Sequence, residues 1–412
     1  MAFTLAGLAY RGFHDFLPGE PHAVVVRRAV LDGLRRLAPV KGGWELAWGP
    51  VTARMPLAVF DSSAMYVARE AGARHRLVVA VRGTNPVASS DWLFGDFLVG
   101  TTVRWPWATD EAAVSTSTAL GLAMLQDMRA RPPSVVARFA EASLDAVGAA
   151  LDERIHSGRA RLAGTTEAQA SAPSSIEALV ERVVEDWSLS DAARDIRDRL
   201  GAATAVRVAP DDLRQRVLPG DARGAGLDLL SFLQAESEAA ARPLEVAVTG
   251  HSKGGALAQA VALWLADARR APDAAEHWDA AGRARITVHA FAAPTPGNAA
   301  FAARLAKTLG DGLHQLRNTN DLVTHAWQAD DLREIPAVYG SRTAKLGRLV
   351  ARVVEAVEGL DYRHAPGAVT FAGSLDATRL LPAELVHQHL DAYADHLDLR
   401  RHGIDAITFF IR

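Results

Sequence analysis

The sequence predicts an α/β fold with a mostly parallel central sheet and helices on both faces. From Leu244 onward, short apolar runs alternate with amphipathic stretches in the order strand, helix, strand, helix, strand. This alternation is typical of right-handed βαβ units, whose parallel strands are buried on both faces. Two earlier β-rich runs, residues 64–70 and 76–84, are separated by a short segment that contains Gly72, which predicts a hairpin.

The elements of the alternating region follow from their residue patterns. Three runs rich in Val, Ile and Ala end in polar or glycine-containing segments, as strands do. A strand-like segment over 362–373 follows, and Pro382 suits the first turn of a terminal helix. We predict strands over 244–250, 285–294 and 313–321, and helices over 117–128, 254–270 and 298–310.

Between residues 129 and 242 the composition changes to alanine, arginine and acidic residues. Because β-rich sequence returns afterwards, we predict one domain over 1–412 with a helical insertion over 129–242. We expect this insertion to serve either as a mobile lid or as a fixed cap. One of its helices is predicted from apolar residues at helical spacing, which are Val136, Ala140, Leu144, Val147 and Leu151.

The composition excludes several classes of protein. A chain of 412 residues with 49% hydrophobic and 23% charged residues is typical of a globular protein. A net charge of −3 gives no basic surface for nucleic acid. The chain has no cysteine, which excludes disulfides, thiolate nucleophiles and zinc–sulfur sites.

The sequence also carries expectations about location. Arg11 and His14 interrupt the first apolar run, which makes it a poor secretory signal. No run approaches the ~18 apolar residues that a membrane-spanning helix needs. We therefore expect a cytoplasmic protein by default and leave open export without a cleaved signal peptide.

The segment TGHSKGG contains the pattern G-x-S-x-G at Gly250, Ser252 and Gly254. It lies between a predicted strand and a predicted helix. A nucleophilic serine on such a sharp turn needs neighbours almost without side chains. The helix N-terminus also directs N–H groups at developing negative charge. The alternative is a glycine-rich turn in which Ser252 only caps the helix.

A serine nucleophile of this type needs an acid and a base, in the order Ser, Asp, His. Asp321 stands at the end of a predicted strand. On a continuous helix His389 would share the inward face with Tyr393, whereas His387 would point elsewhere. A buried structural histidine at position 389 is the alternative. The histidines that follow Asp321 are His325, His364, His387, His389, His396 and His402.

Four segments in order, VAVRGTNPVASSDWLFGDF, VAVTGHSKGGALA, FAAPTPGN and NTNDLVTHAW, resemble the class 3 lipases, the fungal-type branch of the α/β-hydrolases. The resemblance implies the α/β-hydrolase fold, with Ser252 as nucleophile and Asp321 as acid. It places the oxyanion-hole donors at Thr84 and at the Lys253 N–H. The residues that it implies as supports of the oxyanion loop are Arg82, Asp91 and Asp96.

Lys253 departs from the family, whose members usually have leucine at this position. The nucleophile requires only a backbone N–H here, so the ammonium group needs another explanation. Its carbon chain would lie over apolar surface, or its charge would pair with Asp91 or Asp96. The helical block from residue 129 onward is also longer than the usual lid region.

The resemblance implies a serine carboxylic ester hydrolase, a triacylglycerol lipase of lipid metabolism that acts through an acyl-enzyme. No metal or organic cofactor is implied, and the partner is a lipid or other carboxylic ester, met through transient contact with a lipid interface. The alternatives are a phospholipase A1, a hydrolase of small esters or polyesters, and a non-catalytic hydrolase fold that only binds. Loss of the serine, the acid or the base would be the mark of the non-catalytic fold.

Overall fold

The computed structural model describes residues 1–11, 22–53, 63–83, 99–128, 227–269, 277–339 and 344–404. Its centre is a seven-stranded sheet in the order β1-β2-β3-β6-β7-β8-β9. The first three strands pair antiparallel, and the pairs from β3 to β9 are parallel. The main-sheet strands are β1 Trp44–Ala53, β2 Ser63–Glu70, β3 Ala73–Val81, β6 Glu245–His251, β7 Arg285–Phe291, β8 Leu313–Asn318 and β9 Val369–Phe371. A separate pair is β4 Thr102–Arg104 with β5 Ala113–Ser115.

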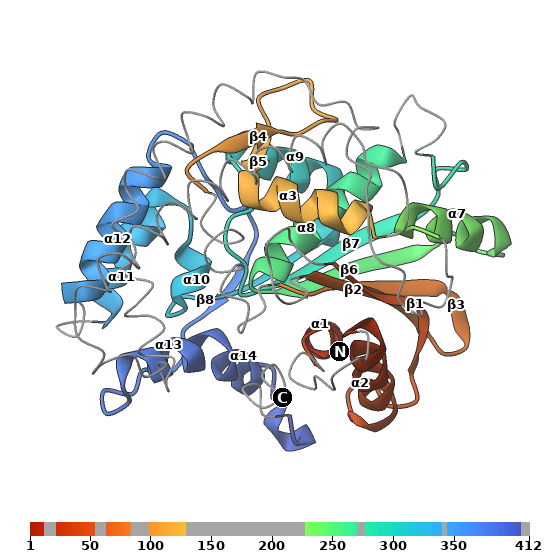
Figure 1. Ribbon diagram of the computed structural model, residues 1–412, viewed down its shortest axis with the longest axis horizontal. Coiled ribbons are helices and arrows are strands. Elements are labelled where there is room, and N and C mark those ends of the chain that lie inside the picture. Colours follow the sequence, from red (N-terminus) through yellow and green to blue (C-terminus); the bar gives the residue numbers. More distant parts are fainter. Residues whose placement is uncertain are drawn as a thin grey trace, which may run out of the picture.

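Helices cover both faces of this sheet (Figure 1). One face carries α3 Thr116–Gln126, α7 Leu229–Ala239, α8 Lys253–Ala268 and α9 Ala299–Leu309. The other face carries α1 Ala2–Leu8, α2 His22–Arg36 and α14 Asp391–His396, with α13 Leu381–His389 beside them. The remaining helices are α10 Leu322–His325, α11 Ala329–Tyr339, α12 Ala344–Val357 and the short 3₁₀ turns η5 Gly310–Gly312 and η7 Arg400–His402.

The arrangement confirms the predicted α/β fold with a mostly parallel sheet. The central strand β6 is buried at Val246, Val248 and Gly250, as expected for a strand covered on both faces. Helix α8, which follows it, is buried from Gly254 to Ala268. Of the helices in the described ranges, none combines the length and apolarity needed to cross a lipid bilayer.

Two sequence predictions differ from the structure in extent. The strand predicted over 362–373 is reduced to β9, because Tyr362 and Ala365 turn inward to pack before the strand begins. The helix predicted from Pro382 is two helices, α13 and α14, which meet at Leu390 with φ −119° and ψ −68°.

Three elements at the N-terminal end, α1, α2 and β1, have no counterpart among the predictions. Helix α1 packs against the sheet through Leu5 and Leu8, which are fully buried. Strand β1 extends the sheet beyond the predicted hairpin by pairing with β2.

Helix α7 lies within the segment predicted as an insertion. Its buried residues Leu229, Phe232 and Leu233 belong to the main core, and Trp48 Nε1 donates to the carbonyl of Leu227 at 3.2 Å. The rest of that segment, residues 129–226, lies outside the described residues. The role of the insertion as lid or cap therefore stays a prediction.

A histidine pair on the sheet predicts how stability depends on pH. His289 of β7 stacks on His314 of β8, with ring centroids 4.6 Å apart. Burial, then His314 and the N-terminal amine, lower the pKa of His289 from 6.5 to about 4. Between these values the unfolded chain binds a proton that the folded chain does not.

We therefore expect the free energy of unfolding to fall as the pH is lowered from 6.5 towards 4. After discounting for partial exposure, His289 should account for on the order of 2 kcal/mol. Urea denaturation at both pH values, in the wild type and in His289→Gln, measures this share. An identical pH dependence in the two proteins would contradict it.

Candidate active site

Ser252 stands on a strained turn between β6 and α8. Its backbone has φ 57° and ψ −136°, a left-handed region that a non-glycine residue seldom adopts. The strain costs about 1–3 kcal/mol and persists only where the surroundings enforce it. The Ser252 N–H donates to the carbonyl of Phe291 at 2.9 Å, and its own carbonyl accepts from the Gly255 N–H at 2.8 Å. These bonds hold the serine at the end of β6, where it is half-buried.

Glycines let this turn close. A Cβ on Gly250 would lie 2.0 Å from the carbonyl oxygen of Gly254. A Cβ on Gly254 would lie 2.6 Å from the backbone nitrogen of Gly83 and from the carbonyl oxygen of Val81. The spacing G-x-S-x-G therefore has a steric cause, and it brings the end of β3 against the start of α8.

Asp321 is buried, with 1% of its surface exposed, just after β8. Its Oδ2 accepts from His389 Nδ1 at 2.9 Å and from the Tyr393 hydroxyl at 3.1 Å. Its Oδ1 accepts from the Val323 N–H at 3.0 Å. A carboxylate so buried is tolerated because several donors replace its water. Burial and then the Asp321 charge raise the pKa of Tyr393 well above its usual value, so its hydroxyl keeps the proton that it donates.

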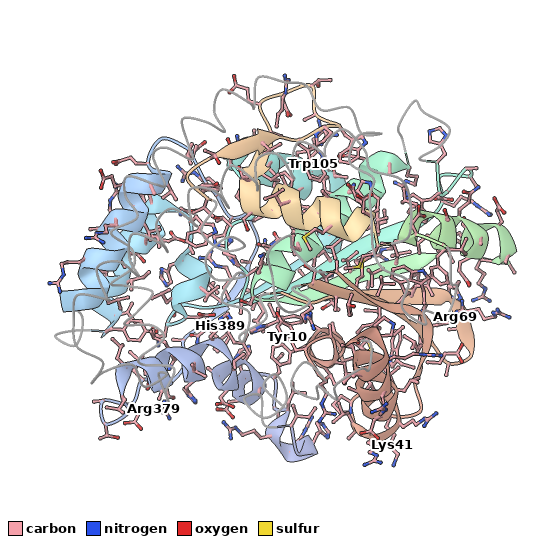
Figure 2. All side chains as sticks on the ribbon, viewed as in Figure 1. Tyr10, Lys41, Arg69, Trp105, Arg379 and His389 are labelled. Carbon is pink, nitrogen blue, oxygen red and sulfur yellow. The ribbon has the colours of Figure 1, made fainter. Side chains whose placement is uncertain are left out.

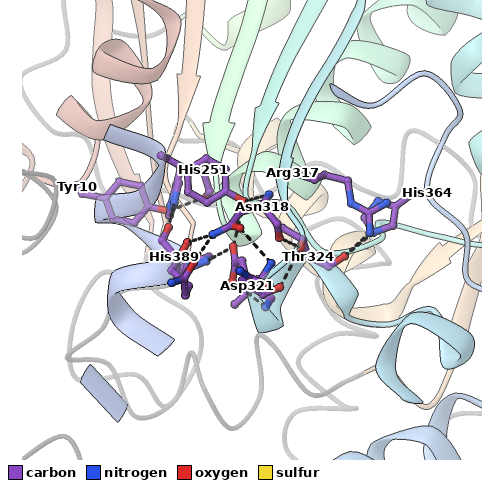
Figure 3. Close-up of polar contacts among 12 residues, drawn as sticks. Tyr10, His251, Arg317, Asn318, Asp321, Thr324, His364 and His389 are labelled. Atoms are coloured by element: carbon purple, nitrogen blue, oxygen red, sulfur yellow. Dashed lines mark hydrogen bonds and ion pairs between the residues drawn. The ribbon is translucent and has the colours of Figure 1, made fainter. Parts of the chain in front are cut away.

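The structure thus brings Asp321 and His389 into contact (Figure 3). His387 points elsewhere, because its Nδ1 lies 3.8 Å from Asp391 Oδ2 on the next turn. The break at Leu390 modifies the predicted single helix. It leaves His389 as the last residue of α13, and Tyr393 reaches Asp321 from α14.

His251, the residue before Ser252, contacts the segment that carries His389. Its Nε2 donates to the backbone carbonyl of His389 at 2.9 Å, and the two imidazole centroids are 4.6 Å apart. Burial first, and then His389, lower the pKa of His251 well below its usual value. His251 is therefore neutral, and its one ring proton satisfies a carbonyl at the end of α13.

Tyr10, which follows α1, bonds to the ends of two strands next to the Ser252 turn. Its hydroxyl donates to the carbonyl of His251 at 2.8 Å and accepts from the Gly83 N–H at 2.9 Å. Figure 2 shows Tyr10 and His389 on the same side of the sheet. Thr84, the next residue after Gly83, lies outside the described residues, as do Asp91 and Asp96. Arg82, predicted to support the oxyanion loop, is buried.

Other histidines after Asp321 bond to backbone carbonyls. His325 places Nδ1 2.9 Å from the carbonyl of Asp331 and Nε2 2.9 Å from that of Thr319. His364 Nε2 donates to the carbonyl of Thr324 at 2.8 Å, and burial lowers the pKa of His364 to about 3. Within the described ranges, no group of three or more His, Cys, Asp or Glu side chains could hold a metal ion.

Lys253 is the first residue of α8 and is half-buried. Any residue except proline supplies the backbone N–H that an oxyanion hole needs at this position. We expect Lys253→Leu to lower kcat by less than roughly tenfold, equivalent to ~1.4 kcal/mol.

Steady-state kinetics on a soluble ester measure this change, with melting temperature as the check on folding. If the side chain pairs with an acidic group, the variant also loses stability, and less so at high salt. A fall in kcat close to that of Ser252→Ala would show instead that the ammonium group takes part in the chemistry.

Sequence reasoning missed Tyr10 and the contact made by His251. Tyr10 lies far from the motif in sequence, and nothing local distinguishes it. The helical face predicted for His389 includes Tyr393, but it does not predict the bond from Tyr393 to Asp321. Asn318 is the buried last residue of β8, within the strand predicted over 313–321.

Comparison with known proteins gives a family match and a shared fold. The sequence profile of the class 3 lipases matches residues 229–330. The crystal structure of M37 lipase superposes with a TM-score of 0.68 at 22% identity, covering 99% of this chain and 96% of that one.

Fungal lipases are more distant. The lipase of Rhizopus microsporus var. chinensis gives a TM-score of 0.34 at 15% identity, covering 79% of this chain and 67% of that one. The Rhizomucor miehei lipase propeptide complex gives 0.38 at 12%, covering 80% and 63%. A search of curated protein sequences finds no significant match.

The family match supports the assignment to the carboxylic ester hydrolases, and the likeness to M37 lipase supports the fold. Both agree with the resemblance that the four sequence segments indicate. The profile match contains Ser252 and Asp321, and it ends before His389. Together the family match and the shared fold confirm the resemblance to the class 3 lipases, and this chain is a lipase-type carboxylic ester hydrolase with the α/β-hydrolase fold.

Proposed function

We propose that this chain hydrolyses lipid esters through an acyl-enzyme on Ser252. The observation that carries the proposal is the 2.9 Å hydrogen bond between the buried Asp321 and His389, beside the strained serine turn. Asp321 engages Nδ1 of His389, which leaves Nε2 as the ring nitrogen that takes a proton. His251, which directly precedes Ser252 in the chain, donates to the carbonyl of His389 and so ties the serine turn to the segment that carries the base.

In the first half-reaction, Ser252 Oγ attacks the ester carbonyl carbon as its proton moves to His389 Nε2. The oxyanion is held by the Thr84 and Lys253 N–H groups, and the alcohol leaves with the proton from His389. Water then attacks the acyl-enzyme with His389 again as base, which releases the acid and restores Ser252. Asp321 keeps the imidazole oriented and stabilises its positive charge.

An acylglycerol is the substrate class that we favour, because the chain is a lipase-type hydrolase. Hydrolysis of acylglycerols would place the protein in lipid metabolism. A phospholipase A1, and a hydrolase of small esters or polyesters, would use the same residues and differ only in the groups around the scissile bond.

Labelling with a serine-directed phosphonate, followed by peptide mapping, tests the nucleophile. A panel of acylglycerols, phospholipids and soluble esters of graded chain length then tests the substrate class. We expect stoichiometric label on Ser252 and the highest kcat/KM on acylglycerols. Preference for the sn-1 ester of phospholipids would reassign the substrate. A folded protein with neither label nor turnover would indicate the non-catalytic alternative.

A further inference from the structure

Asn318, the last residue of β8, has no exposed surface, and every hydrogen-bonding group of its side chain has a partner. Its Nδ2 donates to the backbone carbonyl and to the Oε1 of Gln388, both at 2.8 Å. Its Oδ1 accepts from the N–H of Asn320 at 3.0 Å and of Gly373 at 2.9 Å. A carboxamide has two donors and two acceptor positions, so this side chain is saturated.

The backbone of Asn318 is also bonded, and its carbonyl accepts from the Asp321 N–H at 3.0 Å. The Asn318 N–H donates to the Tyr393 hydroxyl at 2.9 Å, and the same carbonyl also accepts from the Thr324 hydroxyl at 2.9 Å. The Tyr393 hydroxyl in turn donates a hydrogen bond to Asp321 Oδ2. Asn318 therefore joins the loop that carries Asp321, the segment that carries His389 and the chain after β9 (Figure 3).

The partners of Asn318 stand next to the acid and the base in the chain. The Asn320 N–H immediately precedes Asp321, and the Gln388 carbonyl immediately precedes His389. One side chain thus fixes the backbone on both sides of the Asp321–His389 hydrogen bond. Its own rotation is blocked, because all four of its bonds go to different atoms.

Gln388 is held as firmly as Asn318. It has no exposed surface, and its Nε2 donates to Glu384 Oε1 at 2.6 Å and to the Ser374 carbonyl at 2.8 Å. Its Oε1 therefore faces Asn318 as an acceptor. There is no spare room here, since a Cβ on Gly373 would lie 2.1 Å from Gln388 Oε1.

We propose that Asn318 is a positioning residue, which sets the separation of Asp321 and His389 by clamping the residue before each. It acts through these two residues and not on the substrate. The inference rests on the proposed function. A displacement near 1 Å at reacting groups can cost ~10²-fold in rate, so a clamp with this placement should affect turnover more than substrate binding.

Asn318→Ala, compared with Asn298→Ala, tests the proposal. Asn298 is a matched control, because its side chain also bonds to backbone groups of two segments, at Glu111, Ala113 and Phe301. None of those partners adjoins a proposed triad residue. Three quantities are measured: kcat and KM per phosphonate-titrated site, the downfield proton resonance of the Asp321–His389 bond, and melting temperature.

Asn318→Ala is expected to lower kcat by ~10- to 100-fold while KM stays within about twofold. It should also shift or broaden the downfield resonance. Asn298→Ala should lower the melting temperature but leave kcat and the resonance at wild-type values. Gln388→Met, which removes the Oε1 acceptor at similar volume, should follow Asn318→Ala and serves if that variant does not fold.

Wild-type kcat and resonance in either folded variant would overturn the clamp. The resonance reports the Asp321–His389 bond without any substrate. A protein whose resonance responds to Asn318→Ala, but whose Ser252 takes no label, would keep the clamp and reject the proposed function. If Ser252 takes the label but Asn318→Ala leaves the resonance unchanged, the proposed function stands and the clamp is rejected.

Discussion

Ser252→Ala is expected to lower ester turnover by at least ~10³-fold, because in the proposed mechanism the acyl-enzyme forms on Ser252 Oγ. Asp321→Asn should lower it by a similar factor, since the amide cannot hold His389 in the tautomer that leaves Nε2 free to accept a proton. Initial rates on a soluble ester, with active-site titration by phosphonate, measure both losses.

Ser237→Ala is the control for the serine substitution. Ser237 lies on α7 and its hydroxyl bonds to Asp279 at 3.3 Å, so its loss touches no proposed triad residue. Turnover should be unchanged in that variant. Wild-type turnover in Ser252→Ala would reject the acyl-enzyme on Ser252 and with it the proposed mechanism.

His389→Ala should cost about as much as Ser252→Ala, whereas His387→Ala should be mild. The reason is geometric: His389 Nδ1 bonds to the buried Asp321 at 2.9 Å, while His387 faces Asp391. Members of such a triad act as a unit, so losing the base removes nearly the same catalysis as losing the nucleophile.

The measurement is kcat/KM for both variants on one ester, together with their melting temperatures. Both histidines lie on α13, so each variant is the other's control for helix stability. A large loss in His387→Ala with near-normal activity in His389→Ala would assign the base to His387, against the observed contact with Asp321.

Local pattern made part of the site predictable. The serine turn has a steric cause that leaves its mark within a few residues, at Gly250 and Gly254. The strand-helix alternation likewise fixes where Asp321 must emerge. The prediction of His389 as the base depends on the inward face of a single continuous helix. The structure has a break at Leu390, and the contact with Asp321 survives because His389 precedes that break.

The remaining contacts could not be predicted because they join distant segments. Tyr10 bonds to the carbonyl of His251 across 241 positions, and Asn318 bonds to Gln388 across 70. Neither residue stands in a local pattern that specifies a partner. The elements α1 and β1 were missed for a related reason: their place in the sheet depends on pairing and packing rather than on periodicity.

The tie made by Tyr10 has a consequence for how the chain acquires its activity. The hydroxyl of Tyr10 joins Gly83 to His251, and His251 is bonded to the carbonyl of His389. Residues far apart in the sequence must therefore meet before the surroundings of the Ser252 turn are complete, and contacts of such long range form slowly. A nascent or truncated chain would carry the serine long before it could use it, so esterase activity reports completed folding.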